Sequence, residues 1–214
     1  DGERCFIIGN GKSLKETNLR LLKNEYTFGL NRIYLNFDEM GFETSYFVSV
    51  NPLVIDQCAD EISNLQMPKF ISWKSKDKLS LEKNLFFVRR LSTPHFSLDI
   101  SRGMWEGATV TYVAMQIAFF MVFKEVYLVG VDHSFSTKGP PNQVVRSGGE
   151  DRDHFSPEYF GEGFLWHLPD LKTSELAYRI AKATYEKHGR KIQDATLNGK
   201  LAVFEKVDLD AIFS

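Results

Sequence analysis

The residues best suited to chemistry in this chain follow an apolar run at its start. Gly9, Asn10 and Gly11 come directly after residues 5–8, and Ser13 lies two residues further on. A strand that breaks into a glycine turn and then a helix suits phosphate, because glycine allows close approach and the first N–H groups of a helix are unpaired. An Asn tolerates left-handed backbone and its amide both donates and accepts, which suits a ribose or phosphate contact. The segment predicts either a nucleotide site or an ordinary strand-to-helix turn with Ser13 as its N-cap.

This turn matches neither of the two common nucleotide-binding motifs. It is not the dinucleotide pattern G-x-G-x-x-G, and it is not the Walker pattern G-x-x-x-x-G-K-[ST]. The turn alone therefore names no particular nucleotide.

Three further apolar runs also end in polar residues, which are Asn31-Arg32, Asn51 and Asp132-His133. Each Asn is either a turn residue or an amide that orients a base, ribose or phosphate. The guanidinium of Arg32 matches the geometry of a phosphate. Asp132 can bind a metal, a hydroxyl or a base, or it can cap the following turn. If the strands are parallel, their carboxyl ends form one crevice, and such a crevice is where ligands bind in α/β sheets.

A second helix start carries small residues. The backbone N–H groups of Gly107 and Ala108 can face a ligand there, and Thr109 adds a hydroxyl. The alternative is close packing of this helix against the sheet.

Histidines mark the long polar and aromatic segment 134–170. His154 and His167 flank a stretch with Tyr159 in which an imidazole can serve as general base. A loop of this length in a compact domain is usually functional or mobile, and we expect it to close as a lid. Together with Asp132, Asp153 and His133 these histidines also offer metal ligands, but no H-E-x-x-H or comparable spacing is present, and we predict no metal site.

The elements that must position these residues alternate along the chain. We expect strands at 5–8, 26–30, 45–50, 69–73, 85–89, 125–131 and from 191, and helices at 13–22, 54–65, 107–123 and 173–187. Alternation of this kind predicts an α/β fold with a mainly parallel, Rossmann-like sheet flanked by helices. We expect one domain over 1–214 with 134–170 as an inserted lid.

Composition excludes several classes of protein. The net charge of -2 gives no field for nucleic acid, and two cysteines give neither a disulfide framework nor a metal cluster. The longest apolar run, 113–123, falls short of the ~20 residues that span a membrane. We expect a cytoplasmic protein. Any association with the face of a membrane would come through partners or missing domains. The chain starts without Met, and we expect it to be processed or excised from a longer protein.

Taken together, the motifs resemble two related families. Ile8–Glu16, Asn31, Asn51-Pro52 and Lys124–Asp132 are similar to the bacterial sialyltransferases that use CMP-sialic acid, glycosyltransferase family 42. Asp132–Phe135, His154-Phe155, Tyr159-Phe160 and Asn198–Leu201 resemble more closely a broader relative, the DUF115 or MptE-like family. That family takes its name from an archaeal 6-hydroxymethylpterin diphosphokinase, and many of its members belong to surface-polysaccharide pathways.

The resemblance implies a fold and a set of roles. The fold is the sialyltransferase-like variant of GT-A. In the sialyltransferases the G-N-G turn and two Asn residues hold CMP, and these match Gly9 to Gly11, Asn31 and Asn51. His167 stands where those enzymes have their general base. Two Tyr residues contact the donor phosphate there, whereas this chain has Ser134 and Phe135, so the phosphate partner is sought among Tyr159, Arg146 and Arg152.

Our leading hypothesis is an inverting glycosyltransferase that uses a CMP-linked nonulosonic or related acidic sugar for surface glycan synthesis. It would act on a glycan or lipid-linked acceptor, require no metal, and bind no nucleic acid, and it can form a homo-oligomer. One alternative is a pterin diphosphokinase that uses ATP and Mg²⁺. Another is a non-catalytic nucleotide-binding domain of a larger protein.

Overall fold

The computed structural model describes residues 3–136, 138–149 and 151–213. The first two residues of the chain therefore lie outside the described residues, and so do positions 137 and 150 of the predicted lid. None of the helices within the described ranges is both long enough and apolar enough to cross a membrane.

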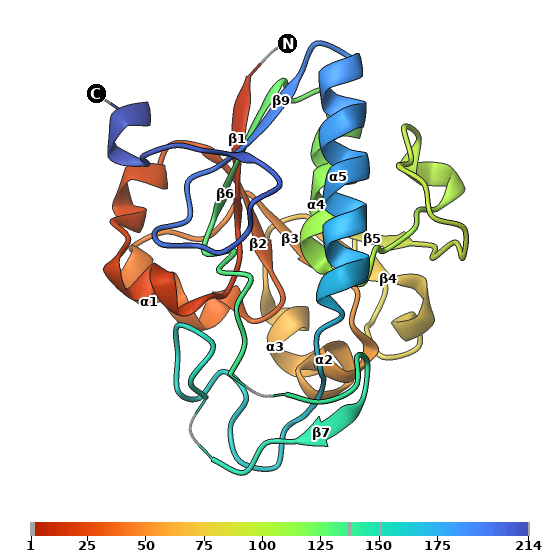
Figure 1. Ribbon diagram of the computed structural model, residues 1–214. Coiled ribbons are helices and arrows are strands. Elements are labelled where there is room, and N and C mark those ends of the chain that lie inside the picture. The colour runs from red at the N-terminus through yellow and green to blue at the C-terminus, as the bar shows by residue number, and fades with distance from the viewer. Residues whose placement is uncertain (1–2, 137, 150, 214) are drawn as a thin grey trace.

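An eight-stranded sheet forms the centre of the molecule, in the order β10-β9-β6-β1-β2-β3-β4-β5 (Figure 1). All of its neighbouring strands pair in parallel. The strands are β1 Arg4–Ile8, β2 Tyr26–Leu30, β3 Tyr46–Ser49, β4 Lys69–Ser72, β5 Leu85–Val88, β6 Glu125–Val129, β9 Lys191–Asp194 and β10 Glu205–Lys206. The predicted α/β class and parallel sheet are confirmed.

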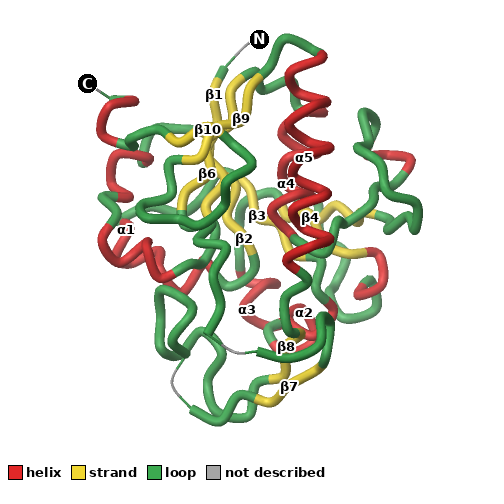
Figure 2. The backbone as a smooth tube through the Cα atoms, in the orientation of Figure 1, coloured by secondary structure: helices red, strands yellow, loops and turns green. Residues whose placement is uncertain are grey.

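Both faces of the sheet are covered, which explains why its central strands read as continuous apolar runs. Cys5 and Ile7 face one buried cluster, and Phe6 and Ile8 face the other, because side chains alternate along a strand. The first cluster lies under the two long helices, α4 Val110–Phe120 and α5 Leu171–Lys187. Figure 2 shows these two helices side by side on one side of the sheet.

Shorter elements cover the opposite face. They are α1 Phe37–Met40, α2 Pro52–Gln57, α3 Ala59–Asn64 and the 3₁₀ turns Lys12–Glu16, Leu19–Leu22 and Ile33–Asn36. Three more 3₁₀ turns lie at Trp73–Ser75, Ile100–Arg102 and Asp210–Ile212.

The predicted helix 13–22 is wrong, because this segment forms two 3₁₀ turns instead of an α-helix. The Thr17 hydroxyl donates to the Ser13 carbonyl at 2.8 Å, and Thr17 itself is extended (ψ 129°). A side chain that bonds the carbonyl four residues back competes with the helical pattern. Ser13 is not an N-cap either, since Gly11 holds that position without a side-chain bond.

Two other helices differ from their predicted bounds. The segment 54–65 divides into α2 and α3 at Cys58, whose backbone leaves the helical region at φ -126°. The helix at 107–123 begins later, at Val110, because Gly107 and Ala108 are left-handed (φ 58° and 57°) and Thr109 caps it.

The segment predicted as an irregular lid contains a small antiparallel hairpin. Its strands are β7 Val144–Arg146 and β8 Leu165–His167. Figure 2 shows both strands at the end of the molecule that lies opposite the two termini. That end is where the strands β1, β2, β3 and β6 finish, so the segment covers their carboxyl ends.

Candidate functional site

A cavity of about 650 Å³ lies at the carboxyl ends of β6, β1, β2 and β3, which are neighbours in the sheet. The predicted convergence of their polar ends at one crevice is therefore seen in the structure. The cavity is lined by thirteen of the fifteen residues expected at the site, namely Gly9, Asn10, Gly11, Asn31, Asn51, Gly107, Ala108, Thr109, Asp132, His133, His154, Tyr159 and His167. Ser13 and Arg32 are not among its lining residues.

The G-N-G turn uses its backbone amides within the fold. Gly9 donates to the Val129 carbonyl and Gly11 to the Gly130 carbonyl, each at 2.8 Å. A Cβ at Gly9 would overlap the Gly130 carbonyl, and one at Gly11 would overlap the carboxylate of Asp132. The two glycines therefore allow β1 and β6 to end in close contact, and their N–H groups do not form the expected phosphate cradle.

Asn10 carries an unsatisfied acceptor at the cavity wall. Its Nδ2 donates to the Leu30 carbonyl at 3.0 Å, which fixes the amide between β1 and β2. Its Oδ1 is buried and has no hydrogen-bond partner in the part of the chain that the structure describes, and the residue is 9% exposed. Because an unpaired buried polar atom is costly, this oxygen suits a donor group on a bound ligand.

Asn31 and Asn51 each use one side-chain oxygen to support the backbone around them. Asn31 is left-handed (φ 49°), and its Oδ1 accepts from the Ser49 hydroxyl at 3.1 Å. Asn51 is the N-cap of α2, with its Oδ1 accepting from Leu53 N at 3.0 Å and Pro52 opening the helix. The Asn31 side chain also hydrogen-bonds the buried Tyr159. The Nδ2 group of Asn51 has no hydrogen-bond partner among the described residues, so this amide can still donate to a ligand.

Replacement of Asn51 separates its capping role from any ligand contact. Asn51→Ala should lower the free energy of unfolding by about 0.5–2 kcal/mol, the usual cost of losing an N-cap. Asn51→Asp keeps the acceptor oxygen and should restore the stability. Urea unfolding of the two variants measures the difference, and equal loss in both would show that the cap is not what Asn51 contributes.

Asp132 holds the turn in place. Its carboxylate accepts from the Ser13 backbone N–H at 3.0 Å and from the Ser13 hydroxyl, and its own carbonyl accepts from Lys200 N at 2.8 Å. An anion thus already sits at the start of the 3₁₀ turn, where the sequence predicted a phosphate. Asp132 lines the cavity as a largely buried, paired carboxylate.

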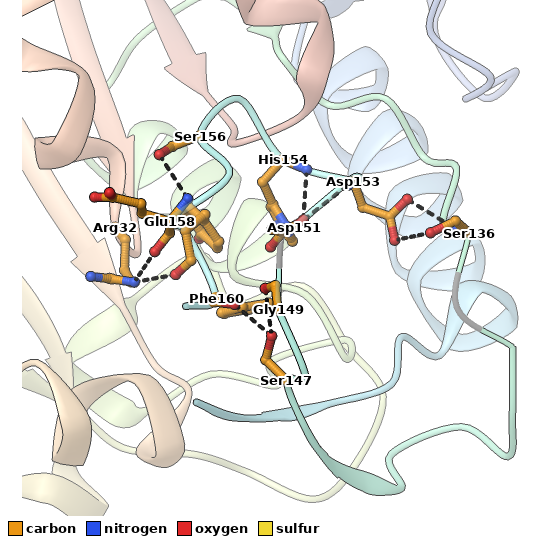
Figure 3. Close-up of polar contacts among 11 residues, drawn as sticks. Arg32, Ser136, Ser147, Gly149, Asp151, Asp153, His154, Ser156, Glu158 and Phe160 are labelled. Atoms are coloured by element: carbon orange, nitrogen blue, oxygen red, sulfur yellow. Dashed lines mark hydrogen bonds and ion pairs between the residues drawn. The ribbon is translucent and has the colours of Figure 1, made fainter. Parts of the chain in front are cut away.

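The lid segment places the carboxylate of Asp151 against His154, a pairing that sequence reasoning missed. Asp151 Oδ2 lies 2.8 Å from His154 Nδ1, and both side chains are largely buried (Figure 3). The His154 ring stacks on Tyr159 with centroids 4.0 Å apart and planes 11° apart. The sequence signal for this pair was the spacing of three residues between Asp151 and His154. Of the two residues, only His154 lines the cavity.

Backbone contacts fix this segment directly onto the G-N-G turn. Gly11 and His154 form an antiparallel bridge, and Phe155 N donates to the Asn10 carbonyl at 3.0 Å. Asp153 accepts from the backbone and the hydroxyl of Ser136, so it joins two parts of the same segment (Figure 3).

Arg32 forms hydrogen bonds with the lid segment and does not line the cavity. Its Nη1 donates to the Glu158 carbonyl at 3.1 Å and to the Tyr159 carbonyl (Figure 3). Its guanidinium also lies 5.1 Å from the centre of the Phe164 ring. Arg32 does not line the cavity, and the phosphate contact predicted for it stays a prediction.

The remaining predicted residues lie on the opposite wall, near α4 and α5. His133 Nε2 lies 3.2 Å from Glu175 Oε1, and Thr109 Oγ1 lies 3.2 Å from the Tyr178 hydroxyl. His167 ends β8, is half-buried, and its imidazole has no hydrogen-bond partner within the described ranges. Two imidazoles, those of His154 and His167, therefore line the same cavity.

Tyr159 is almost completely buried, and burial raises its pKa well above the ordinary value, an effect that Arg32 and Asn31 oppose only in part. The other proposed phosphate partners, Arg146 and Arg152, are exposed and do not line the cavity. In the ranges 3–136, 138–149 and 151–213, no three His, Cys, Asp or Glu side chains come together in a way that could hold a metal ion.

Two solved structures share this architecture. The Maf glycosyltransferase from Magnetospirillum magneticum AMB-1 superposes with a TM-score of 0.59 at 13% identity, over 95% of this chain and 33% of that one. The sialyltransferase CstII from Campylobacter jejuni, solved with the substrate analogue CMP-3FNeuAc, superposes with a TM-score of 0.50 at 15% identity, over 96% of this chain and 86% of that one. The fold is shared with these enzymes.

The likeness in fold to a bacterial sialyltransferase confirms one part of the predicted resemblance. This chain spans about a third of the length of the Maf glycosyltransferase. No protein-family model and no curated protein matches the sequence. The relationship to the DUF115 or MptE-like family stays a prediction.

Proposed function

We propose that this protein is a glycosyltransferase that binds a nucleotide-activated sugar in the cavity at the carboxyl ends of β6, β1, β2 and β3. The observation that carries the proposal is the buried, unpartnered Oδ1 of Asn10 on the cavity wall. A nucleobase amino group or a ribose hydroxyl is the kind of donor that satisfies such an oxygen. The shared fold with two glycosyltransferases supports a sugar nucleotide over other nucleotides.

The three asparagines give the cavity the polar contacts of a nucleoside site. Asn10 offers an acceptor and Asn51 offers its Nδ2 group, while Asn31 lines the cavity beside Tyr159, to which it is hydrogen-bonded. CMP is the nucleotide we favour, because CstII was solved with a CMP-linked substrate analogue. The sugar is then a nonulosonic or related acidic sugar, and the acceptor a glycan or lipid-linked glycan.

His167 is the general base on this proposal. Its free imidazole removes the proton of the acceptor hydroxyl while the acceptor oxygen attacks the anomeric carbon from the side opposite the nucleotide. One base and direct displacement give inversion. The mechanism requires no metal.

Thermal unfolding with a panel of nucleotides tests the donor. A ligand that binds only the folded state at 100 times its Kd stabilises it by about 2.7 kcal/mol. We expect CMP to raise the Tm more than UDP, GDP or ATP, with and without Mg²⁺. Asn10→Ala should abolish this rise, while Asn18→Ala, an exposed Asn without a side-chain capping bond, should keep it.

Other outcomes would redirect the assignment. A rise in Tm with ATP that needs Mg²⁺ would favour the diphosphokinase alternative. Tight CMP binding without transfer from any CMP-sugar would favour a non-catalytic domain. A rise with CMP that Asn10→Ala leaves intact would remove the observation on which the proposal rests.

A further inference from the structure

The proposed donor needs a phosphate partner, and the two glycine N–H groups of the G-N-G turn are already engaged within the fold. The N–H groups of Gly9 and Gly11 donate to the end of β6, and that of Ser13 donates to Asp132. A phosphate that leaves water for a cavity must find other donors or a cation. The charged side chains around the cavity are therefore the candidates for this contact.

His154 is the side chain best placed to meet that need. Its backbone is bridged to Gly11, which keeps its imidazole beside the G-N-G turn. The stack on Tyr159, the edge contact with Phe160 (centroids 4.8 Å apart) and the Asp151 contact hold the ring from three sides. Its Nε2 atom has no hydrogen-bond partner in the described chain, and the residue lines the cavity.

Asp151 places a carboxylate against that imidazole. Burial alone would raise the pKa of Asp151, but the hydrogen bond and charge of His154 and the backbone N–H groups of Asp153 and His154 outweigh it and lower the pKa. The carboxylate is therefore ionised at neutral pH. An anion at hydrogen-bond distance favours the charged form of an imidazole.

The other cations near the cavity are already paired. Arg90 is exposed and lies 3.5 Å from Glu106, and His133 lies 3.2 Å from Glu175 on the opposite wall. Arg90 carries a permanent charge and is the alternative partner for the donor phosphate, so the experiment must distinguish it from His154.

We propose that the His154 imidazolium binds the phosphate of the donor through Nε2 and stabilises it as the leaving group, with Asp151 as its positioning residue. This inference rests on the proposed function. In the transfer step the acceptor oxygen forms a bond to the anomeric carbon as the bond from that carbon to the phosphate oxygen breaks. The hydroxyl proton goes to His167, and the electron pair stays on the nucleotide phosphate. The added negative charge forms next to the His154 cation.

The test compares the affinity of CMP with that of cytidine, because the two differ only in the phosphate. A charge-assisted hydrogen bond to the phosphate should make the wild-type protein bind CMP about 10- to 100-fold more tightly than cytidine. His154→Phe keeps an aromatic ring on Tyr159 and removes the charge, so the ratio of the two affinities should fall towards one. Cytidine affinity should not change.

Asp151→Asn gives a second, milder variant. Its oxygen can still accept from the N–H groups of Asp153 and His154, now at 2.9 and 3.1 Å from Oδ1, so the turn is preserved. The ratio should fall to an intermediate value, which a purely structural role of Asp151 would not produce at constant cytidine affinity. His188→Ala, a change at an exposed residue outside the cavity lining, should leave the ratio as in the wild type.

The outcomes separate this inference from the proposed function. If CMP and cytidine both bind but His154→Phe and Asp151→Asn keep the wild-type ratio, the inference is overturned and the proposed function stands. If Arg90→Ala abolishes the preference for CMP instead, Arg90 is the phosphate partner and the inference is also overturned. If neither CMP nor cytidine binds the wild-type protein, the proposed function fails and the inference fails with it.

Discussion

His167→Ala should abolish sugar transfer while leaving nucleotide binding unchanged. We expect kcat to fall by about 10²- to 10⁴-fold, the usual contribution of a positioned general base. The physical reason is that the His167 imidazole lines the cavity without a hydrogen-bond partner among the described side chains, so its lone pair is available to an acceptor hydroxyl. Initial rates with a CMP-sugar donor measure the effect, and calorimetry with CMP measures the binding.

The matched control for this experiment is His188→Ala. His188 is exposed at the end of α5, and its Nδ1 lies 2.8 Å from the Thr184 carbonyl, outside the cavity lining. This variant should turn over donor at the wild-type rate. Full activity in His167→Ala would exclude His167 as the base, and a matching loss of CMP affinity would make it a binding residue instead.

Gly9→Ala, which adds one methyl group, should cause a large loss in the free energy of unfolding. A Cβ at Gly9 would overlap the Gly130 carbonyl oxygen and lie 2.9 Å from its carbon, and both are backbone atoms at the centre of the sheet. Overpacking usually costs about 1–3 kcal/mol and sometimes more, and fixed backbone places this case at the upper end. Urea unfolding should show a loss of about 3 kcal/mol, a large share of the total stability of a typical domain.

Gly148→Ala supplies the comparison. A Cβ at Gly148 would meet no described atom within 4 Å, and its φ is not in the left-handed region. Its stability should stay within about 0.5 kcal/mol of the wild type, as for most surface changes. If Gly9→Ala were equally stable, the close approach of β1 to Gly130 would not be the reason for glycine in the turn.

The sequence predicted the strands of the sheet well, because a strand that is buried on both faces of the sheet appears in the sequence as a continuous apolar run. β2 agrees with its predicted bounds, and β1 and β3 differ by a residue or so at their ends. The polar residues after these strands and after β6 also predicted the site, since parallel topology brings their carboxyl ends together.

Two of the differences at the site share a physical cause, which is bonding between residues that are distant in sequence. Asp132 binds the backbone of Ser13 across 119 positions, so the turn ends in a 3₁₀ segment that holds a protein carboxylate. Arg32 reaches the Glu158 carbonyl across 126 positions, which removes it from the cavity wall. Local propensity contains no information about either contact.

A different limit applies to the lid. Asp151 and His154 are only three residues apart, but that spacing brings two side chains together only when the backbone between them turns. Here the backbone turns because the N–H groups of Asp153 and His154 both donate to the Asp151 carboxylate. The three-residue strands β7 and β8 are too short to show a reliable alternation.

The most direct test of the account is a crystal structure of the protein with CMP. We expect the nucleotide in the cavity of about 650 Å³, with Asn10 Oδ1 accepting a hydrogen bond from the base or ribose and Asn51 Nδ2 donating to the same nucleoside. Binding elsewhere, such as in the hollow beside Glu175 and Arg179 on α5, with Asn10 Oδ1 still unpaired, would contradict the assignment of the cavity as the donor site.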